Sequence, residues 1–273
     1  MGDMLTKRSR DDEPPAEAPL LLVGLGNPGP RYACTRHNVG ALALERIAES
    51  AAFTPWSFHP ACAAHIAEGR LGAARVVGAR PTAFMNLSGR CLAALAARYK
   101  PAGVLLLHDD LDLALGRVKL KQGGGGGGHR GVASCTAALD GESLWRMRIG
   151  IGRPATKTAV ADYVLEDLTP DEMSALNLER ISRHAPLLFG APSGAPALTA
   201  GSASAFMNAL ARPDDKSRER GSGAGAVNDS RAPPLVGSES ANKRSKSSDS
   251  SAADGAGAQT LAPEEAGDTR GNA

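Results

Sequence analysis

Two polar residues of this sequence could together activate a water molecule. His37 stands in the segment TRHN, and Asp109 lies at the end of the apolar run VLLLHDD. An imidazole with its ordinary pKa of about 6.5 is mostly neutral at cellular pH, as a general base must be. A carboxylate on one ring nitrogen fixes the tautomer and stabilises the imidazolium formed in the reaction. A lone histidine is more often structural, but this pair predicts a hydrolytic site.

Two asparagines could complete this site. Asn27 lies in the turn GLGNPG, directly after an apolar run, and Asn86 lies in FMNLSG. A carboxamide both donates and accepts hydrogen bonds, so it can hold a water molecule or a substrate carbonyl without adding charge. The structural alternative for Asn86 is the N-cap of the next helix. For Asp110 and Asp112 we favour the structural interpretation, a solvated strand end or the cap of the next turn.

Four basic residues could bind phosphate. Arg117, Lys119 and Lys121 alternate along GRVKLKQ, and Arg148 lies in the alternating segment LWRMRIGIG. Alternation puts the first three on one side of a strand, from which they could clamp a terminal phosphate of a nucleic acid. The alternative is the solvated face of a sheet. Binding through phosphates would be insensitive to base sequence and sensitive to salt.

A dinucleotide site competes for the first glycine turn, because GLGNPG matches G-x-G-x-x-G. That fingerprint needs a helix at its third glycine and an acid at the end of a second strand, about 20 residues on. Here Pro28 and Pro30 delay the helix, and Glu45 and Glu49 lie inside it. We therefore expect no nucleotide cofactor, and we interpret the turn as a device that aims Asn27.

Metal binding is a further alternative. His108, Asp109, Asp110 and Asp112 could hold Mg²⁺, but alternate residues of a strand face opposite ways, so we expect no metal and no cofactor. The cysteines form no C-x-x-C pair, which indicates a reduced intracellular chain. They are widely spaced: Cys34, Cys62, Cys91 and Cys135.

The elements that must position these residues alternate between strand and helix. Apolar runs and alternation predict strands at 19–26, 64–81 (a hairpin), 104–110, 116–122 and 144–152. Helical spacing predicts helices at 37–50, 87–100 and 132–140, with a mostly helical remainder to about residue 210. This order predicts an α/β fold, a single-domain mixed twisted sheet flanked by helices, with part of the sheet antiparallel.

The two ends of the chain differ from its middle. Residues 1–19 and 212–273 are rich in Ser, Gly, Ala, Pro and charge, so we expect a disordered leader and a disordered tail around a folded domain at 20–211. The leader has 3 basic and 5 acidic residues and the tail 9 and 10, which leaves 19 and 14 for the domain. A positive domain is consistent with a polyanionic partner, and also with an ordinary enzyme.

Four segments, in this order and at these separations, closely resemble the bacterial-type peptidyl-tRNA hydrolase family: VGLGNPGPRYACTRHNVG, FMNLSG, HDDLDLALG, and GGGGGGHRG followed by RMRIGIGRP. The resemblance covers residues 20–210. It implies a metal-independent enzyme, generally monomeric, that cleaves the ester between a peptide and the tRNA 3′ ribose and so recycles tRNA. Its expected partner is peptidyl-tRNA.

The resemblance also implies roles for single residues. His37 and Asp109 would be catalytic, and Lys119, Lys121 and Arg148 would bind tRNA phosphate. The substrate contacts would be Asn27, Tyr32, Met85, Asn86, His129 and Arg130. At Arg130 the sequence departs from the family's usual His-Asn-Gly, which replaces an acceptor with a long cation. The alternative function is therefore a non-catalytic RNA-binding relative of the splicing type, although the retained polar residues favour an active enzyme.

The run of six glycines before His129 needs its own interpretation. It is not an interdomain linker, because motifs of one site lie on both sides of it, and it is not a P-loop, because no GK[ST] follows. We expect a mobile loop that brings His129 and Arg130 to the rim of the cleft. No apolar run is long enough to span a bilayer and the acidic leader is a poor transit peptide, which favours the cytoplasm over a mitochondrion or plastid.

Overall fold

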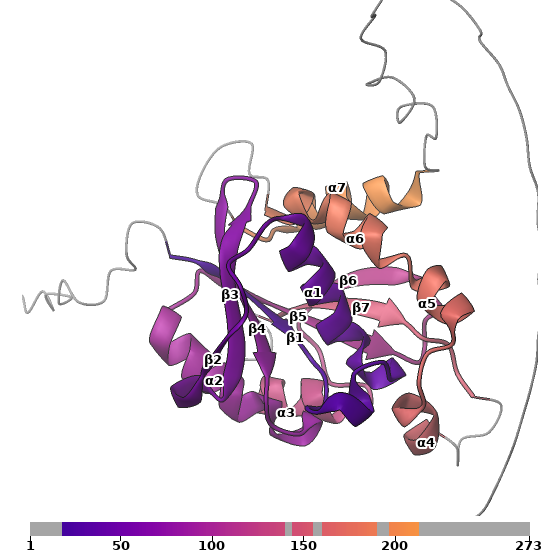
Figure 1. The fold of residues 1–273 in the computed structure, drawn as a ribbon. Helices are drawn as coiled ribbons and strands as arrows, with labels where there is room; N and C mark the ends of the chain where they lie inside the picture. Colours follow the sequence, from indigo (N-terminus) through magenta and orange to yellow (C-terminus); the bar gives the residue numbers. More distant parts are fainter. Residues whose placement is uncertain (1–17, 140–143, 155–159, 190–196, 213–273) are drawn as a thin grey trace, which may run out of the picture. The chain divides into compact units, whose positions relative to one another are not determined.

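The computed structural model describes residues 18–139, 144–154, 160–189 and 197–212 (Figure 1). Within these ranges one mixed sheet has the strand order β2-β3-β4-β1-β5-β7-β6, which confirms the predicted α/β class. The expected leader and tail fall outside the described residues. The strands are β1 (Leu20–Gly24), β2 (Ser57–His59), β3 (Ala64–Leu71), β4 (Ala74–Pro81), β5 (Gly103–Asp110), β6 (Val118–Gln122) and β7 (Trp145–Gly150).

The pairing of the strands brings the predicted site residues to one edge of the sheet. β1 runs parallel to β4 and β5, and β5 runs parallel to β7. β2, β3 and β4 are antiparallel neighbours, as are β6 and β7. The carboxyl ends of parallel strands meet at the same edge, where α/β folds place their sites. Asn27 follows β1 at that edge, and Asp109 lies at the end of β5.

The helices form a layer on each face of the sheet (Figure 1). One core unites α1, α6 and α7 with the sheet, and a second unites α2 and α3 with its other face. Alternate residues of β1 enter the two cores, which explains why this strand is apolar without interruption. The helices are α1 (Val39–Ser50), α2 (Ser88–Tyr99), α3 (Arg130–Ala138), α4 (Val160–Leu165), α5 (Pro170–Leu176), α6 (Leu178–His184) and α7 (Ala200–Ala211).

A close approach at Gly40 places the start of α1 directly against the end of β5. A Cβ atom at Gly40 would lie 2.1 Å from the carbonyl oxygen of Leu107 and 3.0 Å from the Cα atom of His108. Only a glycine lets the two backbones come this near. Because His37 precedes this first turn, the contact brings its side chain beside the end of β5.

The predicted elements agree with the structure in type, and they differ at their ends. The helix expected at 132–140 begins two residues earlier, at Arg130, because His129 caps it. The strand expected at 116–122 begins at Val118, so Arg117 lies before it. β2 was not expected, since three residues carry too little pattern. Among the described residues, no helix is long and apolar enough to cross a membrane.

Candidate active site

His37 and Asp109 are hydrogen-bonded, which confirms the predicted pairing. His37 lies in a 3₁₀ turn, η3 (Arg36–Asn38), that leads into α1. Its Nδ1 atom lies 2.9 Å from Oδ1 of Asp109. A carboxylate oxygen accepts, so Nδ1 carries the proton and donates it. No group among the described residues bonds Nε2 of this ring, which leaves that lone pair free to accept a proton.

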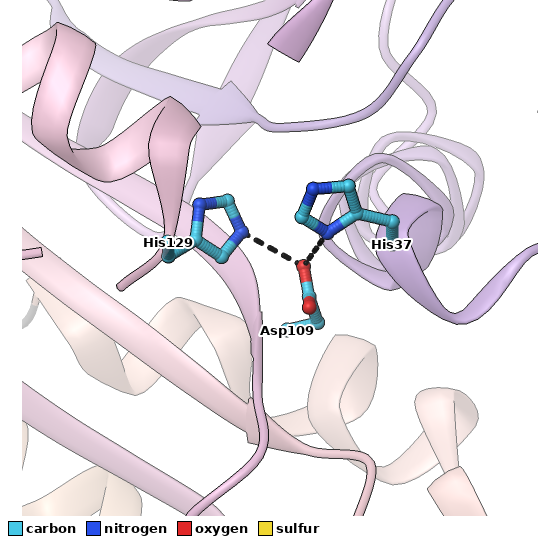
Figure 2. A group of neighbouring side chains, drawn as sticks. All are labelled: His37, Asp109 and His129. Atoms are coloured by element: carbon cyan, nitrogen blue, oxygen red, sulfur yellow. Dashed lines mark hydrogen bonds and ion pairs between the residues drawn. The ribbon is translucent and has the colours of Figure 1, made fainter. Parts of the chain in front are cut away.

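His129 contacts the same carboxylate oxygen from the other side (Figure 2). Its Nε2 atom lies 2.8 Å from Oδ1 of Asp109. Its Nδ1 atom accepts from the backbone N–H groups of Gly131 and Val132, so the side chain is the N-cap of α3. Because backbone N–H groups can only donate, Nδ1 is unprotonated and the proton sits on Nε2. His129 is therefore a neutral donor with both nitrogens occupied.

Asp109 is a buried anion supported by both rings. Its side chain is 3 % exposed. Burial alone would raise the pKa of its carboxyl group, but the interactions with His129 and His37 outweigh burial and lower that pKa well below its usual range. The carboxylate is consequently ionised whenever the protein is folded near neutral pH. It can stabilise a positive charge on the one ring with a free nitrogen, His37.

Among the described residues, His37, Asp109 and His129 are the one group of side chains whose types and spacing could hold a metal ion. Their hydrogen bonds argue against a resident metal. Their ligand atoms lie within 4.8 Å of one another. A metal on Nε2 of His129 would need that nitrogen's lone pair and would move the proton to Nδ1. Nδ1 already accepts from two backbone N–H groups, so the metal would break the cap of α3. The earlier alternative of a site around His108 and Asp110 is not the arrangement found.

His108 lies behind this group and stays neutral. Its Nδ1 atom donates to the carbonyl oxygen of Asp109 over 2.7 Å, and its ring meets the ring of His129 edge-on, with centroids 5.0 Å apart. Burial, followed by the neighbouring His129, lowers the pKa of His108 to about 4. Its Nε2 atom is buried without a hydrogen-bond partner. His108 therefore supports Asp109 through the backbone and adds no charge.

Asn27 lies in the loop after β1, in a hydrogen-bond network that fixes its orientation. Its Oδ1 atom accepts from the backbone N–H of Met85 at 2.9 Å, which leaves the Nδ2 group to donate elsewhere. Asn38, the residue after His37, binds the backbone of Asn27 twice, through Oδ1 at 2.8 Å and Nδ2 at 3.0 Å. The amide predicted from GLGNPG is thus held by the turn that holds His37.

The glycine run is tied down through its backbone. The guanidinium of Arg146 donates to the carbonyl oxygens of Gly125 at 3.0 Å and Gly123 at 2.5 Å. The N–H of His129 donates to Gly126 O at 2.9 Å. The φ angles of Gly123, Gly124, Gly127 and Gly128 are positive, a backbone conformation that glycine adopts without strain. These hydrogen bonds fix the run so that His129 reaches Asp109. His129 is therefore more buried than the rim position expected from the sequence.

Comparisons with known proteins identify the family of this chain. A family model described as peptidyl-tRNA hydrolase matches residues 21–191. The chain belongs to the peptidyl-tRNA hydrolase family. A relative from Paracoccus denitrificans with that name is 48 % identical over 194 residues, 70 % of this chain and 77 % of the relative. A crystal structure of peptidyl-tRNA hydrolase from Acinetobacter baumannii is 31 % identical, with a TM-score of 0.62 over 71 % of this chain and 95 % of that one.

The remaining substrate residues expected from the family differ in exposure. Met85 is buried, and a Cβ atom at Gly131 would strike its sulfur, so Met85 packs on the first turn of α3. Asn86 is exposed in a 3₁₀ turn and caps nothing, so the structural alternative for it is wrong. Tyr32 meets the exposed ring of Phe84 edge-on, with centroids 6.4 Å apart.

The basic residues assigned to tRNA phosphate form one surface on β6 and β7. Lys119 and Arg148 are direct partners across the two strands. Lys119 and Lys121 are exposed. Arg148 donates to Asp110 from Nε at 2.6 Å, so part of its charge is already matched. Arg130 is exposed at the first position of α3.

Three residues that support the site were missed from the sequence. Arg36 and Asn38 flank His37 and are buried, and Arg146 is buried beneath the glycine run. For Arg36 and Asn38 the available signal was their position beside His37 in TRHN. Polar residues that are buried at such a position are bound to partners. No local signal marked Arg146, because its partners are carbonyl oxygens about 20 residues away.

Proposed function

We propose that this chain hydrolyses peptidyl-tRNA at the ester between the peptide and the 3′ ribose, with His37 as general base oriented by Asp109. The observation that supports this most directly is the His37 ring itself. Its Nδ1 proton is engaged by Asp109, and its Nε2 lone pair has no partner within the part of the chain that the structure describes. This is the arrangement that a general base needs.

In this mechanism, Nε2 of His37 takes a proton from a water molecule as the water oxygen attacks the ester carbonyl carbon. The bond from that carbon to the ribose 3′ oxygen then breaks, and the imidazolium returns the proton to this oxygen. The products are the free peptide acid and tRNA with its 3′ hydroxyl. Asp109 stabilises the transient imidazolium. The Nδ2 group of Asn27, whose Oδ1 accepts from Met85, would donate to the carbonyl oxygen.

The substrate-binding roles belong to the same proposal. Tyr32, Met85, Asn86, His129 and Arg130 would contact the substrate around the ester. Lys119, Lys121 and Arg148 would hold a phosphate of the tRNA, in a salt-sensitive and sequence-insensitive way. We further propose that the protein acts as a monomer in the cytoplasm. Size-exclusion chromatography with light scattering and fractionation of cells test these two statements.

The deciding experiment is release of an N-blocked amino acid from tRNA by the purified protein, with and without EDTA. We expect turnover that EDTA leaves unchanged, and a loss of about a thousandfold in kcat for His37→Ala. His59→Ala is the matched control, because His59 lies in the edge strand β2. Salt-dependent tRNA binding without turnover would instead establish the non-catalytic alternative. Normal turnover by His37→Ala would sink the mechanism.

Arg130 tests the departure from the family pattern in the same assay. Because Arg130 is exposed at the start of α3, we expect its charge to assist tRNA binding rather than chemistry. Arg130→Asn should raise KM about threefold, reduce its salt dependence and leave kcat within about twofold. A large rise in kcat would show that Arg130 slows hydrolysis.

A further inference from the structure

The side chain of Arg36, the residue before His37, joins the His37 turn to residues 163–172, some 130 positions later in the chain. Arg36 is buried, and its guanidinium donates to both oxygens of Glu172 at 2.9 and 3.0 Å. It also donates to Glu166 at 2.9 Å and to the carbonyl oxygen of Tyr163 at 3.2 Å. Its Cζ atom lies 4.3 Å from the centre of the Tyr163 ring. The N–H groups of the Arg36 guanidinium thus donate almost entirely to α4, α5 and the link between them.

Backbone contacts make the same connection. The N–H of Arg36 donates to Glu166 O at 3.1 Å, and the N–H of Leu168 donates to Cys34 O at 2.9 Å. Thr35 and Asp167 form an isolated antiparallel bridge between these two bonds. The 3₁₀ turn therefore cannot shift relative to residues 166–168 without breaking these backbone hydrogen bonds.

Tyr163 carries the connection to the other half of the catalytic pair. Its hydroxyl donates to the carbonyl oxygen of Ile151 at 2.6 Å, just beyond the end of β7. The N–H of Ile151 donates to the carbonyl oxygen of Asp110 at 3.1 Å. Asp110 follows Asp109 on β5. A chain of contacts thus runs from the neighbour of His37 to the neighbour of Asp109.

We propose that Arg36 and Tyr163 are positioning residues that set the distance between His37 and Asp109. This proposal rests on His37 being the base. Arg36 fixes the turn, the Tyr163 ring lies against the guanidinium, and the Tyr163 hydroxyl fixes the end of the sheet. Neither side chain touches substrate in this assignment. A misplacement of about 1 Å at reacting groups can cost a hundredfold in rate, so a loosened connection should appear in kcat.

The Glu172 carboxylate, which accepts from Arg36, is itself held by hydrogen bonds at the start of α5. Burial would raise the pKa of this carboxyl group, but the N–H of Thr169 and the guanidinium of Arg36 lower it below its usual value. The hydrogen bond from the N–H of Thr169 is part of a capping box at the start of α5, and it orients the Glu172 carboxylate independently of Arg36. Glu166 is different, because its side chain is 62 % exposed and it meets a single guanidinium nitrogen. It is therefore the matched control.

Tyr163→Phe is the decisive variant, since it keeps the ring over Arg36 and removes only the bond to Ile151. We expect kcat for blocked aminoacyl-tRNA to fall about tenfold while KM stays within about twofold. Glu166→Gln should stay near the original kcat. Arg36→Lys keeps the charge and loses the forked contacts, so it should lose more than Tyr163→Phe. Thermal unfolding checks that each variant is folded.

Two readouts separate positioning from plain stability. Combined with Asp109→Asn, Tyr163→Phe should cost little more than Asp109→Asn alone, because the distance it controls no longer matters. The hydrogen-bonded Nδ1 proton resonance of His37, assigned by its loss in His37→Ala, should broaden or shift in Tyr163→Phe. A lowered melting temperature with unchanged kcat and an unchanged resonance would overturn the proposal. Full activity of His37→Ala would overturn the proposed base instead.

Discussion

His37 and His129 donate to one oxygen of Asp109, and the chain holds the two rings by opposite means. The His37 turn is held by side chains, with buried Arg36 on one side and buried Asn38 on the other. The His129 segment is held by backbone, through glycine carbonyls bound to Arg146 and through the N–H groups at the start of α3. In the first segment the support reaches the neighbours of the histidine. In the second it reaches the histidine itself.

This difference leaves one of the two rings able to accept a proton. Capping α3 consumes Nδ1 of His129, and the bond to Asp109 consumes its Nε2, so this ring can neither take a proton nor change tautomer without cost. His37 is fixed by its neighbours and by one nitrogen, so its other nitrogen stays free. In the proposed mechanism, two histidines at nearly equal distances from one carboxylate therefore have different roles, one as base and one as a fixed donor to the carboxylate.

The largest expected effect comes from Asp109→Asn. The new amide can donate to Nδ1 of His37 and drive its proton to Nε2, which removes the free lone pair, whereas the tautomer of His129 is set independently by α3. We expect kcat to fall about a thousandfold. Nitrogen-15 spectra of the imidazoles should show a changed tautomer at His37 only. A change at His129 alone would reverse the assignment of roles.

Acid stability tests the neutral interior beside His129. The pKa of His108 is about 4 in the folded protein and about 6.5 when unfolded, so the unfolded state binds more protons between these values. Stability contributed by His108 is complete above pH 6.5 and is lost as pH falls toward 4, by about 3 kcal/mol, or roughly a few hundredfold in the unfolding equilibrium. Urea unfolding at pH 7, 5.5 and 4.5 measures this loss.

His108→Gln is the comparison for that measurement, because glutamine cannot take up the proton. Its stability should fall less between pH 7 and 4.5 than that of the original protein. Parallel curves for the two proteins would show that His108 already titrates in its ordinary range when folded.

A smaller effect is expected from separating the two jobs of His129. In His129→Asn the side chain can still cap α3 but is too short to reach Asp109, so kcat should fall about tenfold with little change in stability. His129→Ala loses the cap as well and should be about 1 kcal/mol less stable than His129→Asn. Equal stability of the two variants would show that Nδ1 contributes nothing to the helix.

Much of the fold and part of the site were predictable from the sequence. The buried strand before Asn27 and the strand that ends at Asp110 have apolar runs that admit little else, and four motifs in order identified the family. The pairing of His37 with Asp109 followed from their residue types together with the family resemblance, and their hydrogen bond confirms it. The boundary of α3 was wrong by two residues, because its cap is a histidine, which is not among the common capping residues.

The place of His129 could not be predicted, for a physical reason. Six glycines permit many backbone paths, and the sequence does not say which of them brings the ring inward. The path is selected by Arg146, which lies on a neighbouring strand and becomes a partner of the run only when β7 takes its place in the sheet.

The sequence by itself determined the alternation of strands and helices, the family and the pair His37 and Asp109, because these depend on local pattern and residue chemistry. Tertiary structure alone decided the tautomer of His129 and the hydrogen bonds by which Arg146 holds the glycine run. It also decided the burial of Arg36 and its link through Tyr163 toward Asp109. Each depends on groups distant in sequence meeting in space, and hydrogen-bond donors and acceptors acquire their roles only when those partners are in place.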